Sequence, residues 1–583
     1  MINFWKRGSD GRPPSGEGNM VLSKASVMTI DDPGENGQGQ AGIGGEDCSA
    51  LKDFGEGGIF GTYETVLYGN RISMVAGRDA SSRLIYRVLE PIMDLEMNDV
   101  LSFVDRNKDL FLMSTMRELN PERGIEQRFR SFVLSHRKDV QDAVMERCLY
   151  YIKKKFIGAG QIDPFLVDPR VEDTTVSGEG QGVFVMLAGG DNVREGYYRT
   201  SVILNGNDYL NMLLRVSQIS SMSPSYLTPI VDGTIASNSD RVNLVFGTQV
   251  SPSGGSYTIR SVKEIPFTVA NLIKGREMSV EMVAWLWFMV ERGASGLIMG
   301  STGSGKTTLL NALLLFVPAG RKVSVIEDTR ELRLPDGTNW TVGLTRKSGR
   351  MGHDFKPITL HDQLVSALRQ RPDYITVGEI RGSEAYTLFD AMSTGHIGYG
   401  TVHAGGLEDL HNRFASNPGV EGSMYVPPAL QNSLSFIIHV SQVLLPIPGV
   451  FQRRKVLNIW ENRPSEYRST ATGRVNVTPE FIMDANGRGL FTYDPGNDSF
   501  EGPSSGVVEG YLLDHFASRE GMSHEEALID LNRRATVLNY IVSEGSNMTP
   551  SRMYLELNYY SKTKKLKDVW RKYAVNLPYA EGV

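Results

Sequence analysis

The sequence predicts a multidomain α/β protein, and three observations support this prediction. A short apolar run at residues 296–299 precedes a glycine-rich loop, and helix formers follow from Thr308 to Phe316. From about residue 279 to 445, short apolar runs alternate with helical stretches, which is typical of a parallel sheet covered by helices. The chain of 583 residues is also too long for one hydrophobic core, so three or four domains are expected.

Composition places the chain among ordinary globular proteins. Charged residues make up 22% and hydrophobic residues 40%, and the net charge of −6 argues against a protein built to coat nucleic acid. Cys48 and Cys148 are far apart, so neither a disulfide framework nor a cysteine zinc site is indicated, which fits a reducing cytoplasm. The longest apolar run, residues 282–290, is shorter than the roughly 20 residues that span a bilayer. We therefore expect a soluble protein that reaches a membrane only through a partner.

The periodicity of apolar residues divides the chain into five segments. The first is rich in Gly, Ser, Asp and Pro without apolar periodicity, which is typical of a flexible tail. The second is helical, most clearly at 129–134 and 140–152, and the third mixes an amphipathic helix with strands at 173–176, 182–186, 242–246 and 257–260. The fourth is the α/β core around the glycine-rich loop, and the last begins with a small antiparallel sheet and continues as helices. The predicted segments are residues 1–58, 59–157, 158–276, 277–450 and 451–583.

The glycine-rich loop predicts a nucleotide site. It fits G-x-x-x-x-G-K-[ST], the phosphate-binding loop of nucleoside triphosphatases. Backbone N–H groups of such a loop curl around an anion, and the N-terminus of the following helix adds a favourable dipole. Lys306 is expected to reach the β- and γ-phosphates, and the Thr307 hydroxyl to ligate Mg²⁺. The predicted phosphate-binding residues are Gly300, Ser301, Thr302, Gly303, Ser304, Gly305, Lys306, Thr307 and Thr308.

Acidic residues follow two further predicted strands of the core. Open α/β sheets place ligand sites at the carboxyl ends of their strands, and phosphoryl transfer needs groups that hold Mg²⁺ and orient the attacking water. The residue after the second of these strands, Glu379, is the predicted acid for the Mg²⁺ water shell. A carboxylate at a strand end is otherwise often a helix cap or a surface charge, so both interpretations stay open. The candidates are Glu327, Asp328, Glu331 and Glu379.

Histidines and arginines complete the candidate set. His396 and His403 are seven positions apart among glycines, and no third ligand lies at metal spacing. Their imidazole N–H groups can sense a γ-phosphate, whereas an isolated histidine is usually structural. Arg241 and Arg260 flank a pair of predicted strands, and Arg381 directly follows a core strand. A surface arginine is usually only a solvated charge.

Taken in order, these motifs resemble the Walker A, Asp-box, Walker B and His-box set of the type II/type IV secretion ATPase superfamily, the GspE-like family. The resemblance covers about residues 158–445 and extends more weakly to a hairpin at 490–500. Within the superfamily the chain is most similar to the archaeal branch, and it lacks the tetracysteine zinc motif of many bacterial members. The matching runs are 300–307, Ile326-Glu-Asp-Thr-Arg-Glu331, Arg369-Gln-Arg-Pro-Asp-Tyr-Ile-Thr-Val-Gly-Glu-Ile-Arg-Gly382 and Thr394–Ala404.

The resemblance implies a RecA-like P-loop ATPase core with a separate α/β, PAS-like N-terminal domain. ATP is held between the two domains, and Mg²⁺ is bound with it by the core. It also implies a homohexameric ring that drives a pilus, an archaellum or protein secretion through a polytopic membrane platform protein. Such a protein is cytoplasmic, lies at the inner face of the membrane through its partner, and binds no nucleic acid. The implied roles are phosphate and Mg²⁺ binding for Lys306 and Thr307, water polarisation for Glu331, the Walker B acid for Glu379, nucleotide sensing for His396 and His403, and phosphate contacts for Arg241, Arg260 and Arg381.

Two other functions are weighed against this one. A nucleic-acid translocating or packaging ATPase would use a similar core, but the acidic composition and the lack of a basic-aromatic groove disfavour it. A GTPase switch needs N-K-x-D, and the nearest string, Asn107-Lys108-Asp109, has the wrong spacing and precedes the phosphate loop.

Overall fold

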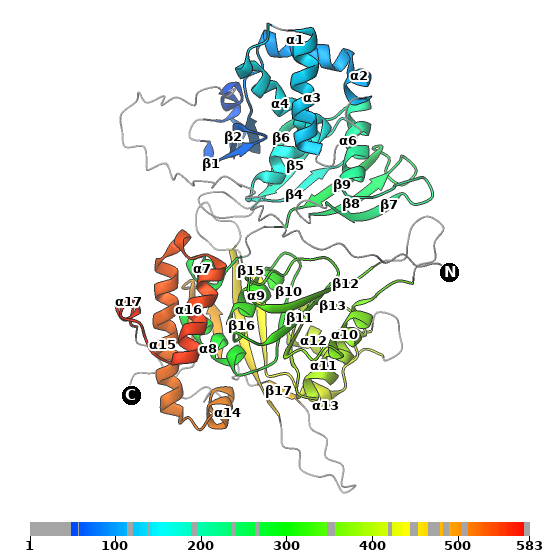
Figure 1. The fold of residues 1–583 in the computed structure, drawn as a ribbon. Helices are drawn as coiled ribbons and strands as arrows, with labels where there is room; N and C mark the ends of the chain where they lie inside the picture. The colour runs from blue at the N-terminus through cyan, green and yellow to red at the C-terminus, as the bar shows by residue number, and fades with distance from the viewer. Residues whose placement is uncertain are drawn as a thin grey trace, which may run out of the picture. The chain divides into compact units, whose positions relative to one another are not determined.

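The structure is a computed structural model in which the chain divides into two compact units, each built from strands and helices (Figure 1). The first unit comprises Met1–Val185 and Tyr197–Val216, and the second Met186–Gly196 and Ser217–Val583. The predicted tail lies outside the described residues up to residue 47, and the 3-10 helix η1 (Cys48–Asp53) follows. The described residues are 48–55, 58–113, 121–137, 139–187, 196–235, 240–262, 267–346, 356–417, 423–443, 453–464, 479–481, 489–502 and 511–575.

The first unit opens with three antiparallel strands where helices were expected. They are β1 (Ile59–Leu67), β2 (Asn70–Arg78) and β3 (Leu84–Leu89). Tyr68 and Gly69 join the first two strands with φ of 51° and 86°, the backbone of a tight two-residue hairpin. Aromatic and β-branched residues such as Tyr63 and Val66 favour an extended chain here. The helical prediction is therefore wrong over residues 59–89.

Helices follow this meander, and the two that were predicted most clearly are both present. They are α1 (Leu95–Arg106), α2 (Lys108–Met113), α3 (Pro121–His136), α4 (Asp142–Phe156), α5 (Asp163–Val167) and α6 (Gly206–Ile219). The predicted stretches 129–134 and 140–152 lie almost entirely within α3 and α4. These two helices pack with α1 into one core through Val104, Phe129 and Leu149.

The strands predicted in the third segment are present. They are β4 (Val171–Val176), β5 (Gly182–Leu187), β8 (Arg241–Phe246) and β9 (Gly255–Arg260), and two strands that were not predicted, β6 (Gly196–Ile203) and β7 (Ile230–Thr234), occur beside them. Strands of the first unit follow the order β1-β2-β3-β6-β5-β4. In the second unit, β7, β8 and β9 form an antiparallel ladder in which Arg241 lies directly opposite Arg260.

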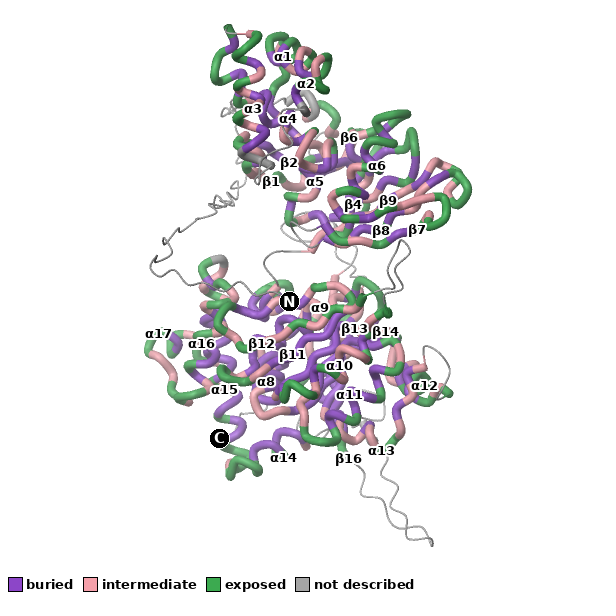
Figure 2. Tube along the Cα trace, turned by 45° about the vertical axis from the view of Figure 1, so that its right-hand side comes forward, coloured by how far each residue is buried: buried purple, intermediate pink, exposed green. Residues whose placement is uncertain are grey.

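A ten-stranded sheet forms the centre of the second unit. Its parallel strands are β10 (Gly296–Gly300), β11 (Lys322–Glu327), β12 (Asn339–Leu344), β13 (Tyr374–Ile380), β14 (Ile397–His403) and β15 (Phe436–Val443). They are arranged as β12-β11-β13-β14-β10-β15, which confirms the predicted parallel core. Strands β10, β11 and β13 are buried along almost their whole length (Figure 2). Apolar residues on successive positions are expected in a sheet that is covered on both faces.

The predicted small antiparallel sheet continues this sheet rather than standing apart. Its strands are β16 (Arg453–Pro464), β17 (Pro479–Phe481), β18 (Phe491–Asp494) and β19 (Ser499–Glu501). β16 pairs antiparallel with β15 over the register from Phe436↔Glu461 to Val443↔Arg453, and β18 and β19 follow at the edge. Residues after 451 therefore contribute to the same sheet as the phosphate loop.

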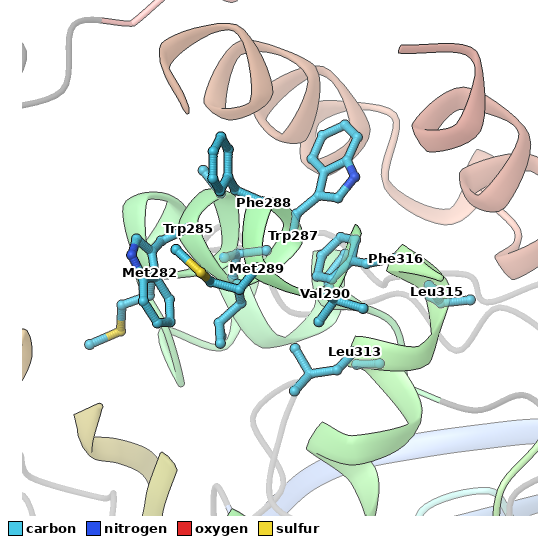
Figure 3. Close-up of a cluster of buried hydrophobic side chains, with 14 of the residues drawn as sticks. Met282, Trp285, Trp287, Phe288, Met289, Val290, Leu313, Leu315 and Phe316 are labelled. Carbon is cyan, nitrogen blue, oxygen red and sulfur yellow. The ribbon is translucent and has the colours of Figure 1, made fainter. Parts of the chain in front are cut away.

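One helix is buried on all sides. The helices of this unit are α7 (Val269–Lys274), α8 (Val280–Glu291), α9 (Lys306–Leu313), η3 (Leu314–Phe316), α10 (Leu360–Leu368), α11 (Glu384–Ser393), α12 (Leu407–Phe414), α13 (Pro428–Gln431), α14 (Tyr511–Arg519), α15 (His524–Ser543), α16 (Pro550–Thr563) and α17 (Asp568–Arg571). Every residue of α8 from Met282 to Val290 is buried, because this run has no polar face to turn to solvent. Its side chains meet Leu313, Leu315 and Phe316 in one cluster (Figure 3). In the part of the chain that the structure describes, no helix has the length and apolar character needed to cross a membrane.

Candidate nucleotide-binding site

The phosphate loop connects β10 to α9, as the motif predicts. Gly305 precedes the first residue of α9 with φ of 94°, a left-handed conformation that favours glycine. At Gly300 a Cβ would lie 2.1 Å from the carbonyl oxygen of Val440, so no larger residue fits. Thr307 and Thr308 occupy the first turn of α9, and both are half-buried. The backbone thus forms the tight turn into a helix N-terminus that suits a phosphate group.

Lys306 folds back over the loop. Its Nζ donates to the carbonyl oxygen of Ser301 at 2.7 Å and lies 3.4 Å from Nδ1 of His403. The side chain is 6% exposed, and this burial lowers the pKa of Lys306, while the nearby Glu379 opposes the effect. A cation held by a carbonyl oxygen can exchange this contact for a phosphate oxygen at little cost, because one acceptor replaces another.

Glu379, His403 and Arg381 form the centre of the site. Oε1 of Glu379 lies 2.9 Å from Nε2 of His403, and Oε2 accepts from Arg381 at 2.5 Å. Burial raises the pKa of Glu379, but the hydrogen bond and charge of Arg381, then His403 and Lys306, outweigh it and leave this pKa below its usual range. Burial and the charge of Lys306 lower the pKa of His403. The carboxylate is therefore ionised, and the imidazole is neutral near pH 7.

The two adjacent acids of the Asp-box, Glu327 and Asp328, make different contacts. Glu327 is buried, and its Oε1 accepts from the backbone N–H groups of Glu331 and Leu332, each at 3.0 Å. Burial raises the pKa of Glu327 to about 7. Asp328 accepts from the Thr345 hydroxyl at 3.0 Å and lies 3.9 Å from Arg381. Glu327 thus shapes the loop that presents Glu331, whereas Asp328 borders the Glu379 cluster.

Two arginines lie opposite each other on β8 and β9. Like charges at directly opposed positions repel each other and weaken an antiparallel pair. A bound anion would reduce this repulsion between the two guanidinium groups. Arg241 meets Glu331 at 2.8 Å and donates to the carbonyl oxygen of Thr329 at 3.3 Å. Arg260 is exposed at the end of β9.

His396 does not join this cluster. It precedes β14, and its backbone N–H donates to the carbonyl oxygen of Ala391 at 3.1 Å. His403 ends the same strand beside Gly300. A strand rises about 3.3 Å per residue, so seven positions separate the two histidines by roughly 20 Å. The two histidines thus lie far apart within one subunit, and His403 is the one beside Lys306 and Glu379.

Two further polar residues contact the site and were missed in the sequence. Oε1 of Glu384 accepts from the backbone N–H groups of Arg381 and Gly382 at 2.6 and 2.8 Å, and so fixes the turn after β13. An acid three residues after Arg381, at a helix start, is the signal that would have found it. Gln442 donates to the carbonyl oxygen of Gly303 at 3.2 Å. No local pattern predicts a contact between residues so far apart in the chain.

Known proteins match part of this chain. The family described as "Type II/IV secretion system protein" matches residues 238–501. Protein MJ0900 of Methanocaldococcus jannaschii is 35% identical over 336 residues, which cover 58% of this chain and 57% of the relative. Protein MJ1287 of the same organism is 38% identical over 277 residues, which cover 48% of this chain and 92% of the relative. The chain thus spans little more than half of the first relative but nearly all of the second.

A relative with a described role and a solved structure match more distantly. The type IV secretion system protein PtlH of Bordetella pertussis is 34% identical over 187 residues, covering 30% of this chain and 53% of PtlH. Among solved structures, the pilus retraction motor PilT with bound ADP aligns with 64% of this chain and 92% of its own at 17% identity and a TM-score of 0.36. The family is shown by the sequence matches and by the α/β core with its motifs in order. The chain belongs to the type II/IV secretion system ATPase superfamily.

Proposed function

We propose that this protein is a motor ATPase that hydrolyses ATP to drive assembly of a pilus-like filament or protein secretion. One observation carries the proposal. Lys306 of the phosphate loop lies within 3.4 Å of His403, which in turn lies 2.9 Å from Glu379 at the end of the neighbouring strand. A cation, a carboxylate and an imidazole thus meet at the mouth of a loop that is shaped for phosphate.

The residues divide the chemistry of hydrolysis between them. Backbone N–H groups of the loop and Lys306 bind the β- and γ-phosphates of ATP. Glu331 polarises the water that attacks the γ-phosphorus; the bond to the β–γ bridging oxygen breaks, and ADP and inorganic phosphate leave. Thr307 and Glu379, the latter through water, would hold a Mg²⁺ ion, which supplies positive charge between the phosphates. Arg241, Arg260 and Arg381 provide further positive charge for the transition state.

His403 connects the nucleotide to the carboxylate. Its Nδ1 lies 3.5 Å from the Thr302 hydroxyl and 3.4 Å from Lys306, and its Nε2 faces Glu379. A neutral imidazole carries one N–H, so a change at one ring nitrogen changes what the other can do. Loss of the γ-phosphate therefore alters the hydrogen bonding of Glu379 through this ring. This link suits a motor, in which hydrolysis must change the preferred arrangement of the protein.

The finer features of the machine are part of the proposal. PtlH, which is similar in sequence to this chain, is a type IV secretion system protein. By analogy we propose a homohexamer that acts at the inner face of the cell membrane on a polytopic platform protein, with no nucleic acid involved. In this view residues 158–276 and 277–450 form the two domains that hold ATP.

The test is hydrolysis by the purified full-length chain with and without Lys306→Ala. The variant should lose turnover and keep its thermal unfolding midpoint. Lys562→Ala, which removes an exposed lysine from α16, is the matched control and should hydrolyse ATP like the wild type. Turnover by Lys306→Ala at the wild-type rate would end the proposal. Hydrolysis that rises with added DNA, with a steep salt dependence, would instead favour a nucleic-acid motor.

A further inference from the structure

The phosphate loop has a neighbour from beyond the parallel core. Gln442 on β15 and Arg454 on β16 are direct partners in the antiparallel pairing of these strands. Gln442 donates from Nε2 to the carbonyl oxygen of Gly303 at 3.2 Å. Cδ of Arg454 lies 3.4 Å from the position that a Cβ of Gly305 would take. The cross-strand pair therefore borders the two glycines of the loop that have positive φ.

The alternation of side chains along β16 directs Arg454 to this loop. Its neighbour Lys455 is buried and points the other way, with its Nζ 2.6 Å from Oδ1 of Asp498 and over the rings of Tyr493 and Phe500. Arg453 lies on the same side as Lys455, because successive residues of a strand face opposite sides. Three successive cations thus divide between the edge hairpin and the phosphate loop.

Gln442 can set the direction of a loop peptide. The carbonyl and the N–H of a trans peptide point in opposite directions. Because Gln442 holds the carbonyl oxygen of Gly303, the N–H of Ser304 turns to the other side of the loop, where it meets the carbonyl oxygen of Ser301 at 3.4 Å. A hydrogen bond of that length is weak, so a phosphate oxygen can replace this acceptor. This contact comes from a side chain 139 residues away, so it depends on the register between β15 and β16.

Arg454 brings the chemistry that phosphate recognition needs. A guanidinium stays charged at every working pH and carries five N–H donors in a planar fork, which suits phosphate oxygens. The guanidinium extends only a few bonds beyond Cδ, and Cδ already lies beside Gly305 at the turn that enters α9. The Arg454 residue is half-buried, so its stem has less freedom to lose when a ligand arrives than that of a fully exposed arginine.

We propose that Arg454 binds a phosphate group of the nucleotide held by the phosphate loop of its own subunit, and that Gln442 is a positioning residue for that loop. The inference deepens the proposed function and rests on it. It adds a cation from β16, outside the motifs by which the site was identified.

The experiment is an equilibrium titration of full-length chains with fluorescent mant-ATP and mant-ADP. Arg454→Met keeps most of the stem and removes the charge, and it should weaken mant-ATP binding by about tenfold or more, as expected for a lost hydrogen bond to a charged group. Arg454→Lys keeps the charge and should lie closer to the wild type. Arg453→Met removes the same charge from the opposite side of β16 and should bind like the wild type.

A purely structural role predicts a different pattern. In that case Arg454→Met, which still packs against Gly305, would bind mant-ATP like the wild type, and this result would overturn the inference for Arg454. Gln442→Met should weaken mant-ATP and mant-ADP equally, since loop shape affects the phosphates that both share; unchanged binding of both would overturn its positioning role. A wild-type chain that binds neither probe would remove the proposed function itself, whereas normal wild-type binding with an unaffected Arg454→Met removes only this inference.

Discussion

The second unit contains two clusters of charged side chains that differ in how their charges are satisfied. In the first, between α8, α15 and α16, Arg534 meets Glu291 at 2.8 Å and Asp530 at 3.0 Å, and Lys564 meets Glu291 at 2.6 Å. Arg534 has no exposed surface. In the second, at the phosphate loop, Lys306 bonds to a carbonyl oxygen, and the side chain of Arg381 is 62% exposed. The first cluster pairs its cations with carboxylates, whereas in the second Lys306 bonds to a neutral carbonyl oxygen and Arg381 stays exposed.

The difference indicates which ion pairs of this fold stabilise it and which are available to bind a ligand. Burying charge is costly, and a buried arginine is tolerated when carboxylates and hydrogen bonds surround it. Cations of Arg534 and Lys564 outweigh burial and lower the pKa of Glu291, so this cluster stays ionised and fastens the C-terminal helices to α8. A basic run such as residues 562–567 is usually a solvated helix face. Lys564 instead belongs to the buried cluster, and Lys567 pairs with Glu556 at 2.5 Å.

The largest loss of stability is expected from removing Arg534, the cation that is most completely surrounded by carboxylates. Arg534→Met leaves Glu291 and Asp530 buried without their main cation, which should lower the free energy of unfolding by about 3–5 kcal/mol. Arg533→Met, on the exposed side of the same helix, should change it by less than about 0.5 kcal/mol. Urea denaturation of both variants measures the difference. Equal stability of the two would show that the C-terminal cluster contributes nothing to the fold.

A substitution in the cluster at the phosphate loop should change the rate of ATP hydrolysis rather than the stability. Glu331→Gln removes the carboxylate that polarises water and should reduce the rate of ATP hydrolysis by roughly 10²–10⁴-fold, the usual range for a general base. Because the Glu331 side chain is partly exposed, the unfolding midpoint in urea should hardly move. Glu525→Gln, at the exposed start of α15, serves as the control. A rate that stays within a few-fold of the wild type would assign water polarisation to another residue.

A buried carboxyl that lacks such cations should show the opposite pH dependence from Glu291. Glu461 on β16 is fully buried beside Asp514 and the backbone N–H groups that start α14, and burial raises its pKa to about 8. The folded state therefore holds a proton that the unfolded state releases above its ordinary pKa near 4.5. Stability from this group is complete at low pH and falls by up to about 1.4 kcal/mol per pH unit until pH reaches the folded pKa.

Glu461→Gln is neutral at every pH and should flatten this slope. Urea unfolding at about pH 5, 6.5 and 8 compares the two proteins over the window that the folded and unfolded pKa values define. The wild type should lose stability relative to the variant as pH rises. Parallel curves would mean that Glu461 is ionised in the folded protein.

The sequence predicted those features that depend on local or periodic order. The strand, loop and helix from Gly296 to Leu313 are one continuous motif, and parallel strands must bring Glu327 and Glu379 to the same edge of the sheet. The motif order could not show that His396 lies at the far end of β14 from His403. The spacing of two histidines does not reveal that a strand lies between them. Gln442 was missed because its contact with Gly303 arises only when β15 pairs beside β10.

The smallest change in stability is expected at an arginine–carboxylate pair of the site that has the same separation as a pair in the buried cluster. Arg241 meets Glu331 at 2.8 Å, the same distance as between Arg534 and Glu291, yet the two side chains are 31% and 29% exposed. Partly exposed pairs contribute about 0–1 kcal/mol, so Arg241→Gln should leave urea unfolding nearly unchanged. If Arg241 turns from Glu331 to a phosphate during hydrolysis, the same variant should slow turnover by about tenfold or more. If Arg241→Gln instead lowers the free energy of unfolding and leaves ATP turnover normal, the Arg241–Glu331 pair has a structural role like that of the C-terminal cluster. The two regions would then not differ in the way their ion pairs are used.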